Sequence, residues 1–170
     1  MLDFQNYAVN NLPNITQLKF KKVHKNYLKV ILSNLFILFI IIFLALFFLI
    51  KLKLKEIIPD YIILIYGIFS VLLIVTVCIY KIGFSKRKYA LREKDISYKD
   101  GLLFKRLTTV PFSRIQHIEV KETVFSQFFK LGTLSIYTAG DSSDDLEIRG
   151  ITKEEAFRIK EYISTIINEK

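Results

Sequence analysis

The 170-residue chain is poor in the side chains that carry disulfide, metal and nucleotide chemistry. Cys78 is its single cysteine, so no disulfide can form within the chain. His24 has no second histidine or cysteine nearby, which argues against a metal site there. The glycines form neither a GxGxxG nor a P-loop pattern, and Ser113, Ser126 and Ser135 lack the glycine-flanked turn of a hydrolase nucleophile. The sequence therefore predicts no enzyme, no cofactor and no small-molecule substrate.

Charged side chains are absent from two long stretches, of 21 residues between Lys29 and Lys51 and of 20 residues between Asp60 and Lys81. As a helix at about 1.5 Å per residue, each covers the roughly 30 Å hydrocarbon core of a bilayer. The first stretch is too long for a signal peptide and ends without a small-residue cleavage site, so we expect it to stay in the mature protein. No carboxylate, histidine or basic side chain lies within either stretch, which argues against an ion or proton path.

This pattern divides the chain into five parts. We expect a cytoplasmic or interfacial segment at 1–29, transmembrane helices at 30–50 and 61–80, an external loop at 51–60 and a cytoplasmic domain at 81–170.

Basic residues gather at the outer ends of the two stretches. They are Lys19, Lys21, Lys22, Lys25 and Lys29 before the first, and Lys81, Lys86, Arg87, Lys88, Arg92 and Lys94 after the second. The connecting loop has only Lys51, Lys53 and Lys55. Because flanks rich in lysine and arginine stay in the cytoplasm, we expect a two-span protein of the plasma membrane with both termini cytoplasmic, the inverted arrangement being the alternative.

Membrane topology and anionic lipids also account for the net charge of +9, so nucleic acid is not an expected partner. Lys86, Arg87 and Lys88 directly follow the second apolar stretch. They are candidates for contact with anionic lipid headgroups, at about 1 kcal/mol each, although stopping translocation explains them equally well.

From Lys88 onward, apolar residues alternate with polar ones, which predicts short strands. The Asp100-Gly101 pair predicts a tight hairpin, with the next strand resuming at Leu102. Pro111 cannot donate a ladder hydrogen bond and so marks a strand end or edge. Further strands are expected at 115–121, 133–139 and 146–149.

After Gly150 the hydrophobic period becomes helical. Thr152 and Glu155 form a capping-box pattern, and the apolar residues that follow recur at spacings of three and four. The predicted fold class is α+β: a two-helix transmembrane hairpin, then a strongly bent antiparallel sheet with a C-terminal helix over one open end.

The string Arg114-Ile-Gln-His117 brings a guanidinium, an amide and an imidazole close together in sequence. In a strand, Arg114 and Gln116 share one face and His117 lies on the other, so the three side chains do not converge. We therefore expect a structural role, in which Arg114 ties a loop to backbone carbonyls or to an acidic partner.

Three strings follow one another in the soluble part: from Tyr89 through Asp95 to Gly101-Leu-Leu, from Thr108 to His117, and from Leu131 to Gly140. In this order they resemble the bacterial pleckstrin-homology-like domain of YdbS-like, membrane-flanked proteins. The residues that carry the resemblance, and for which it implies structural roles, are Asp95, Gly101, Pro111, Arg114, Gln116, Gly132, Thr138 and Gly140.

The resemblance implies a non-enzymatic, pleckstrin-homology-like barrel on a membrane hairpin. Eukaryotic relatives of this fold often hold inositol phosphates with basic residues of the first hairpin, which makes Lys105 and Arg106 further candidates for headgroup contact. Acidic residues stand among them, so a dedicated phosphoinositide pocket is not expected.

Two functions are compatible with these features. The first is a membrane-anchored scaffold or adaptor at the cytoplasmic face, whose domain binds lipid headgroups, another membrane protein or a second copy of itself. The alternative is an auxiliary subunit of a membrane exporter or of an envelope-stress or antimicrobial-resistance system, in which the spans carry the recognition.

Overall fold

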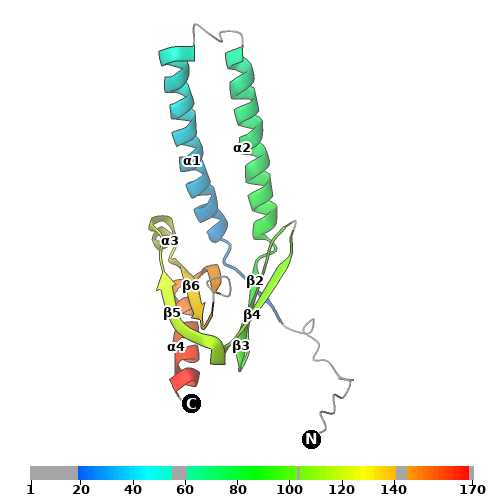
Figure 1. Cartoon of the computed structure of the whole chain (residues 1–170), viewed down its shortest axis with the longest axis vertical. Coiled ribbons are helices and arrows are strands. Elements are labelled where there is room, and N and C mark those ends of the chain that lie inside the picture. The colour runs from blue at the N-terminus through cyan, green and yellow to red at the C-terminus, as the bar shows by residue number, and fades with distance from the viewer. Residues whose placement is uncertain (1–18, 55–60, 103, 141–144, 169–170) are drawn as a thin grey trace, which may run out of the picture.

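The computed structural model describes residues 19–54, 61–102, 104–140 and 145–168. Two long helices, α1 (Tyr27–Leu49) and α2 (Ile62–Phe84), run side by side and rise from one end of a domain of strands and shorter helices (Figure 1). A π-helical turn, η2 (Ile50–Leu54), continues α1. Most of the expected external loop, 55–60, and the first part of the expected N-terminal segment, 1–18, lie outside the described residues.

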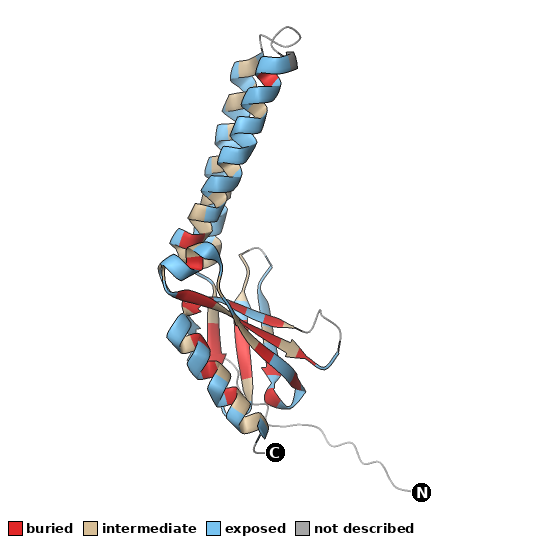
Figure 2. Ribbon diagram, turned by 90° about the vertical axis from the view of Figure 1, so that its left-hand side faces the viewer, coloured by how far each residue is buried: buried red, intermediate tan, exposed pale blue. Residues whose placement is uncertain are grey.

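The two helices present most of their apolar side chains outward, whereas the strands of the domain are largely buried (Figure 2). Phe36 is 65% exposed and Ile63 is 87% exposed, while Phe39 and Phe69 pack together with their ring centroids 5.3 Å apart. By length and composition both helices can cross a membrane. The core helix of a soluble protein buries such side chains, whereas these two helices leave them exposed.

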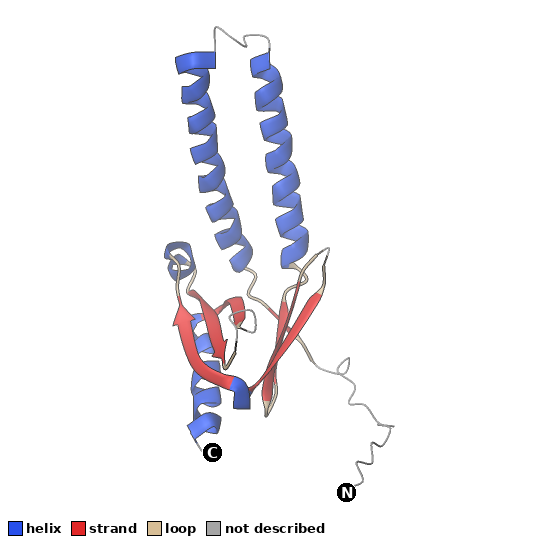
Figure 3. Cartoon of the chain, in the orientation of Figure 1, coloured by secondary structure: helices blue, strands red, loops and turns tan. Residues whose placement is uncertain are grey.

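The domain is built from two antiparallel sheets and two helices (Figure 3). The first sheet has the order β1 (Lys21–Lys22), β2 (Lys88–Leu91), β3 (Asp95–Asp100) and β4 (Arg106–Pro111). The second has the order β5 (Ile115–Lys121), β6 (Leu131–Thr138) and β7 (Leu146–Thr152). A 3₁₀ turn, η4 (Phe112–Arg114), joins the sheets, while α3 (Val124–Phe128) links β5 to β6 and α4 (Lys153–Asn168) follows β7.

The two sheets and α4 enclose one hydrophobic core. Ile96 of the first sheet and Ile148 of the second are fully buried, and α4 contributes Ile163 to the same cluster. Phe112 of η4 is buried at the corner between the sheets and meets Tyr162 of α4 edge to face. This arrangement confirms the predicted α+β class and the bent antiparallel sheet covered by a terminal helix.

The hairpin between β3 and β4 is wider than predicted, because β4 begins at Arg106 rather than at Leu102. Gly101 follows β3 with a φ of +98°, and a Cβ on it would lie 1.8 Å from the Phe104 carbonyl oxygen. The chain thus folds back on itself after Gly101 before pairing resumes, which only glycine permits. Elsewhere in the domain, β6 begins two residues earlier than predicted and β7 continues to Thr152.

The residues before α1 form part of the domain. Lys21 and Lys22 pair with Tyr89 and Lys88, so β1 is the outer strand beside β2. Val23 is buried in the core cluster. The backbone N–H of His24, the next residue, donates to the Gly150 carbonyl at 2.7 Å. The chain therefore leaves the domain through β1, forms the two long helices, and returns through β2.

Tyr27, the first residue of α1, packs against Gly150 of β7. Gly150 has a φ of +82°, and a Cβ on it would lie 2.2 Å from Cγ of Tyr27. The Tyr27 ring thus packs directly on the backbone of β7, which fixes where α1 leaves the domain.

Glu155 of α4 joins the helix to β1 and β2. Its carboxylate accepts a 2.6 Å hydrogen bond from Lys21 Nζ, and the Tyr89 phenol donates to the same group. The Thr152 hydroxyl accepts from the Glu155 backbone N–H at 3.3 Å, which is one half of the predicted capping box. Burial alone would raise the pKa of Glu155, but the hydrogen bonds from Lys21 and Tyr89 outweigh it and lower the pKa below its usual value.

Gly150→Ala should destabilise the domain by roughly 2 kcal/mol or more, because alanine is disfavoured at positive φ and its Cβ would collide with Tyr27. Thermal unfolding of the full chain in detergent measures the loss. The matched control is Gly67→Ala in α2, where an added Cβ meets nothing within 4 Å. Equal stability of both variants would mean that Tyr27 does not sit on Gly150.

Glu155→Gln should lower the free energy of unfolding at pH 7 by about 1 kcal/mol. Because the pKa of Glu155 is lowered in the folded state, its stabilising effect is present above the unfolded pKa, near 4.5, and is lost as the pH falls through the folded value. The difference in the free energy of unfolding between wild type and variant should therefore shrink below about pH 4.5. Glu154→Gln, an exposed neighbour, is the control, and a difference independent of pH would contradict the ionic role of Glu155.

Candidate functional site

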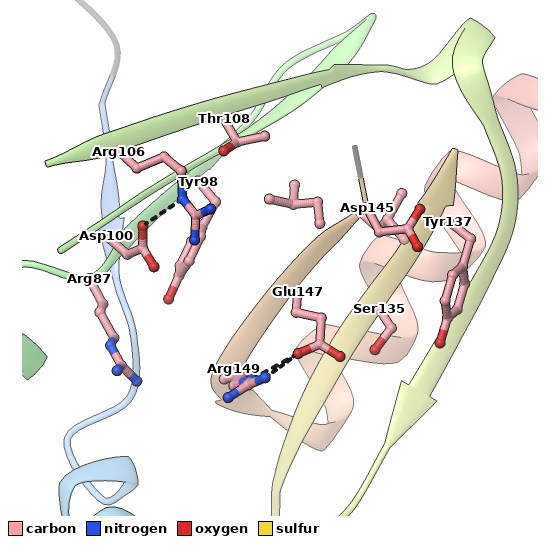
Figure 4. A pocket seen from close by; sticks show the side chains of 12 residues that line it. Arg87, Tyr98, Asp100, Arg106, Thr108, Ser135, Tyr137, Asp145, Glu147 and Arg149 are labelled. Carbon is pink, nitrogen blue, oxygen red and sulfur yellow. Dashed lines mark hydrogen bonds and ion pairs between the residues drawn. The ribbon is translucent and has the colours of Figure 1, made fainter. Parts of the chain in front are cut away.

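A cavity of about 500 Å³ lies between β3 and β4 of the first sheet and β6 and β7 of the second (Figure 4). Its size is within the range of ligand pockets in proteins. Its lining carries three guanidinium groups and three carboxylates. The cavity is lined by Arg87, Tyr98, Asp100, Arg106, Thr108, Ser135, Ile136, Tyr137, Asp145, Leu146, Glu147 and Arg149.

The three arginines are contributed by segments close to the long helices. Arg87 comes just after the end of α2, and its guanidinium lies 5.8 Å from the ring centroid of Tyr27, the first residue of α1. Arg106 is the first residue of β4. Arg149 directly precedes Gly150, on which Tyr27 packs. The arginine side of the cavity therefore lies at the end of the domain from which the helices rise.

The arginines differ in how well they are neutralised. Arg149 donates to Glu147 through two nitrogens, at 2.5 and 2.9 Å, and this hydrogen bonding raises its pKa above the usual value. The ion pair between Arg106 Nε and Asp100 Oδ1 is long, at 3.7 Å, and Arg106 is largely exposed, so the pair contributes little. Arg87 forms no ion pair with any carboxylate in the described part of the chain. Arg87 and Arg106 are thus the lining cations most open to an added anion.

Two hydroxyl groups add hydrogen-bonding capacity to the lining. Burial raises the pKa of Tyr98 to about 12 against the opposing effect of Arg87, so the phenol stays protonated at physiological pH and can donate. Ser135 is 1% exposed, and its Oγ has no hydrogen-bond partner among the described residues. In Figure 4, Ser135 lies between Glu147 and Tyr137. A buried hydroxyl without a partner is costly and is satisfied when a bound polar group reaches it.

The five residues predicted to contact lipid headgroups divide into two groups. Arg87 and Arg106 line the cavity together, although they are far apart in sequence. Lys86, Lys88 and Lys105 are not part of the lining. The structure thus places two of the five predicted cations in one site.

Sequence reasoning missed three of the polar groups at this site. Arg149, Tyr98 and Ser135 each read as one residue of an alternating strand, and no local pattern marks them. Only the approach of β3 and β4 to β6 and β7 brings them together. No group of three or more His, Cys, Asp or Glu side chains that could hold a metal ion occurs in the described ranges.

The predicted orientation of the Arg114 string needs correction. A β-bulge at the start of β5 interrupts the alternation, so Gln116 and His117 are both exposed instead of facing opposite ways. The His117 ring stacks on Tyr137, with the centroids 5.8 Å apart. Arg114 Nη2 donates to the Ala139 carbonyl at 3.4 Å, in agreement with the predicted tie to a backbone carbonyl.

None of the eight residues that carry the family resemblance lines the cavity. Several make local contacts that shape turns and strand ends. Asp95 accepts a 2.6 Å hydrogen bond from Arg92 between β2 and β3, and Pro111 is the last residue of β4. The backbone N–H of Thr138 donates to Asp145 at 3.0 Å, linking the end of β6 to the start of β7.

Comparison with known proteins gives one match. A family model described as "Bacterial PH domain" matches residues 27–166, which include both long helices and almost all of the domain. No curated protein and no solved structure matches the chain. The finer assignment to YdbS-like proteins stays a prediction.

Proposed function

Because this chain belongs to the bacterial PH domain family, we propose that it is a membrane-anchored, non-enzymatic binding module whose inter-sheet cavity binds the phosphate of an anionic lipid headgroup. In this proposal α1 and α2 span the plasma membrane and the domain lies on its cytoplasmic face. The observation that carries it is the meeting of Arg87 and Arg106 in one cavity directly beside the ends of the two helices.

Two features support the membrane anchoring. The helices are 26 and 23 residues long, counted from Tyr27 to Leu52 and from Ile62 to Phe84, and their apolar side chains are exposed. The outer flanks of this pair carry more lysine and arginine than the connecting loop, which favours a cytoplasmic domain.

The chemistry of the cavity favours a phosphate group. Guanidinium groups bind phosphate oxygens with two parallel hydrogen bonds. Among the described residues, no carboxylate pairs with Arg87 and so none competes with a phosphate for its guanidinium. The long contact between Asp100 and Arg106 leaves the Arg106 guanidinium able to turn towards an incoming anion. The protonated Tyr98 phenol can donate a further bond.

The carboxylates limit how much negative charge the cavity accepts. Asp100, Asp145 and Glu147 equal the three arginines in number, so the lining has no excess of positive charge. A single phosphodiester, as in phosphatidylglycerol, fits this balance better than a headgroup with several phosphates, which the carboxylates would repel.

Replacing the two cavity arginines tests the proposal. Arg87→Gln with Arg106→Gln should weaken phosphatidylglycerol binding by the full chain in neutral detergent at least roughly tenfold, because charged hydrogen bonds to the phosphate are lost. Native mass spectrometry measures the bound lipid, with phosphatidylcholine and inorganic phosphate as further ligands.

The control is Lys88→Gln with Lys105→Gln, which removes the same charge from neighbouring positions outside the cavity. Binding in this variant should change less than threefold. An equal loss in both double variants would show general attraction to a basic surface and would contradict a site in the cavity. Equal affinity for inorganic phosphate alone would contradict a lipid ligand.

A further inference from the structure

Two segments of the domain reach the level at which the long helices begin and end. Figure 1 shows α3 beside the base of α1 and the connection between β3 and β4 beside the base of α2. Lys29 Nζ, in the first turns of α1, lies 5.8 Å from the centroid of the Phe129 ring, just after α3. On the other side, Leu102 Cβ lies 3.8 Å from the position that a Cβ on Gly83 of α2 would occupy.

These contacts set both segments at the boundary of the apolar stretches. Lys29 is the last charged residue before the first stretch and Lys81 is the first after the second. In the proposed anchored state, lysines at such positions reach the headgroup region. Segments level with them therefore also lie in that region.

The side chains that these segments present are apolar and unusually exposed. Phe104 is 89% exposed, Phe128 is 87% exposed and Val124 is 76% exposed. Every other large hydrophobic side chain in the described part of the domain is at most 42% exposed. The three most exposed apolar groups of the domain thus all lie on the side from which the helices rise.

The local structure of α3 holds two of these side chains in place. Thr123 and Ser126 form a complete capping box, and the buried Ser126 faces the domain. Val124 and Phe128 are four residues apart and therefore share one face of the turn, opposite to Ser126. Lys105 directly follows Phe104 and Lys130 comes two residues after Phe128, and both lysines are exposed. Exposed apolar side chains flanked by lysines are typical of segments that lie in a membrane interface.

We propose that Phe104 on one side of the hairpin and Val124 with Phe128 on the other insert into the same lipid leaflet that α1 and α2 enter. This inference rests on the proposed membrane anchoring. With the hairpin between them, the two insertions give the domain three contacts with one leaflet. Three contacts fix its tilt, so that the arginine side of the cavity faces the headgroups.

Depth-dependent quenching in liposomes of the full chain tests this insertion. A nitrobenzoxadiazole label is placed on Phe104→Cys or Phe128→Cys in a Cys78→Ala background, and lipids with doxyl groups near the headgroup serve as quenchers. We expect strong quenching at both positions and at most one third of it at Phe157→Cys on α4, an exposed aromatic position of the same domain.

Val71, at the middle of the second uncharged stretch and 58% exposed, provides the control for anchoring. Labelled as Val71→Cys in the Cys78→Ala background, it should be quenched by lipids with doxyl groups deep in the acyl chain. Absence of that quenching would overturn the anchoring itself. Quenching at position 71 with none at positions 104 and 128 would overturn only the insertion of the loops.

A second measurement separates insertion from mere proximity. A label on Gln127→Cys should lose at least half of its shallow quenching when Val124, Phe128 and Phe104 are all replaced by serine. Unchanged quenching would show that the tether alone brings α3 near the lipid and would overturn the proposal. A different result would also overturn the proposal: labels at positions 104 and 128 that are not quenched by lipid but become shielded from water as the protein density in the liposomes rises. Such labels would be covered by a second copy of the chain.

Discussion

The pairing of β1 with β2 is the constraint on which the rest of the structure depends. The strand that leads into α1 and the strand that follows α2 are neighbours in one sheet, with Lys22 opposite Lys88. The two helices are thus a loop inserted between adjacent strands, and both of its ends are hydrogen-bonded to the domain. A domain joined to its spans by one flexible linker would have no such fixed orientation.

This constraint explains how the site is placed. Because β2 starts directly below α2, Arg87 is held against Tyr27 at the foot of α1. Tyr27 in turn packs on Gly150 of the second sheet, next to Arg149. The contacts that fix the helix pair therefore also bring the first sheet, the second sheet and their arginines to the same end of the cavity. Anchoring and the geometry of the cavity have a common structural origin.

Local pattern was enough to predict much of this architecture. The two uncharged stretches indicated the long helices, and alternation indicated the strands. The spacing of Ala156, Ile159, Tyr162, Ile163 and Ile166 predicted one apolar face of α4, of which Ala156, Ile159 and Ile163 are buried. The three quoted strings pointed to the bacterial PH domain family, which the family match confirms. These signals are all carried by neighbouring residues, and so they can be read without a structure.

The remaining features depend on contacts between distant residues. A strand of two lysines has no periodicity, so β1 could not be recognised before its partner was known. The bulge before His117 follows from the register of β5 on β6, and the late start of β4 from the path of the chain after Gly101. The cavity needs both sheets, which is why Arg87 and Arg106 were foreseen as separate basic residues and Arg149 was not foreseen at all.

A crosslink between β1 and β2 tests the central claim most directly. In isolated membranes containing the Cys78→Ala chain with Lys22→Cys and Lys88→Cys, mild oxidation should join the two cysteines rapidly, because these residues face each other across the strand pair. The pair Lys25→Cys and Lys88→Cys, with one residue moved beyond the strand, should crosslink far more slowly. Equal rates for the two pairs, or no crosslink in either, would contradict a hairpin held at its base by the domain.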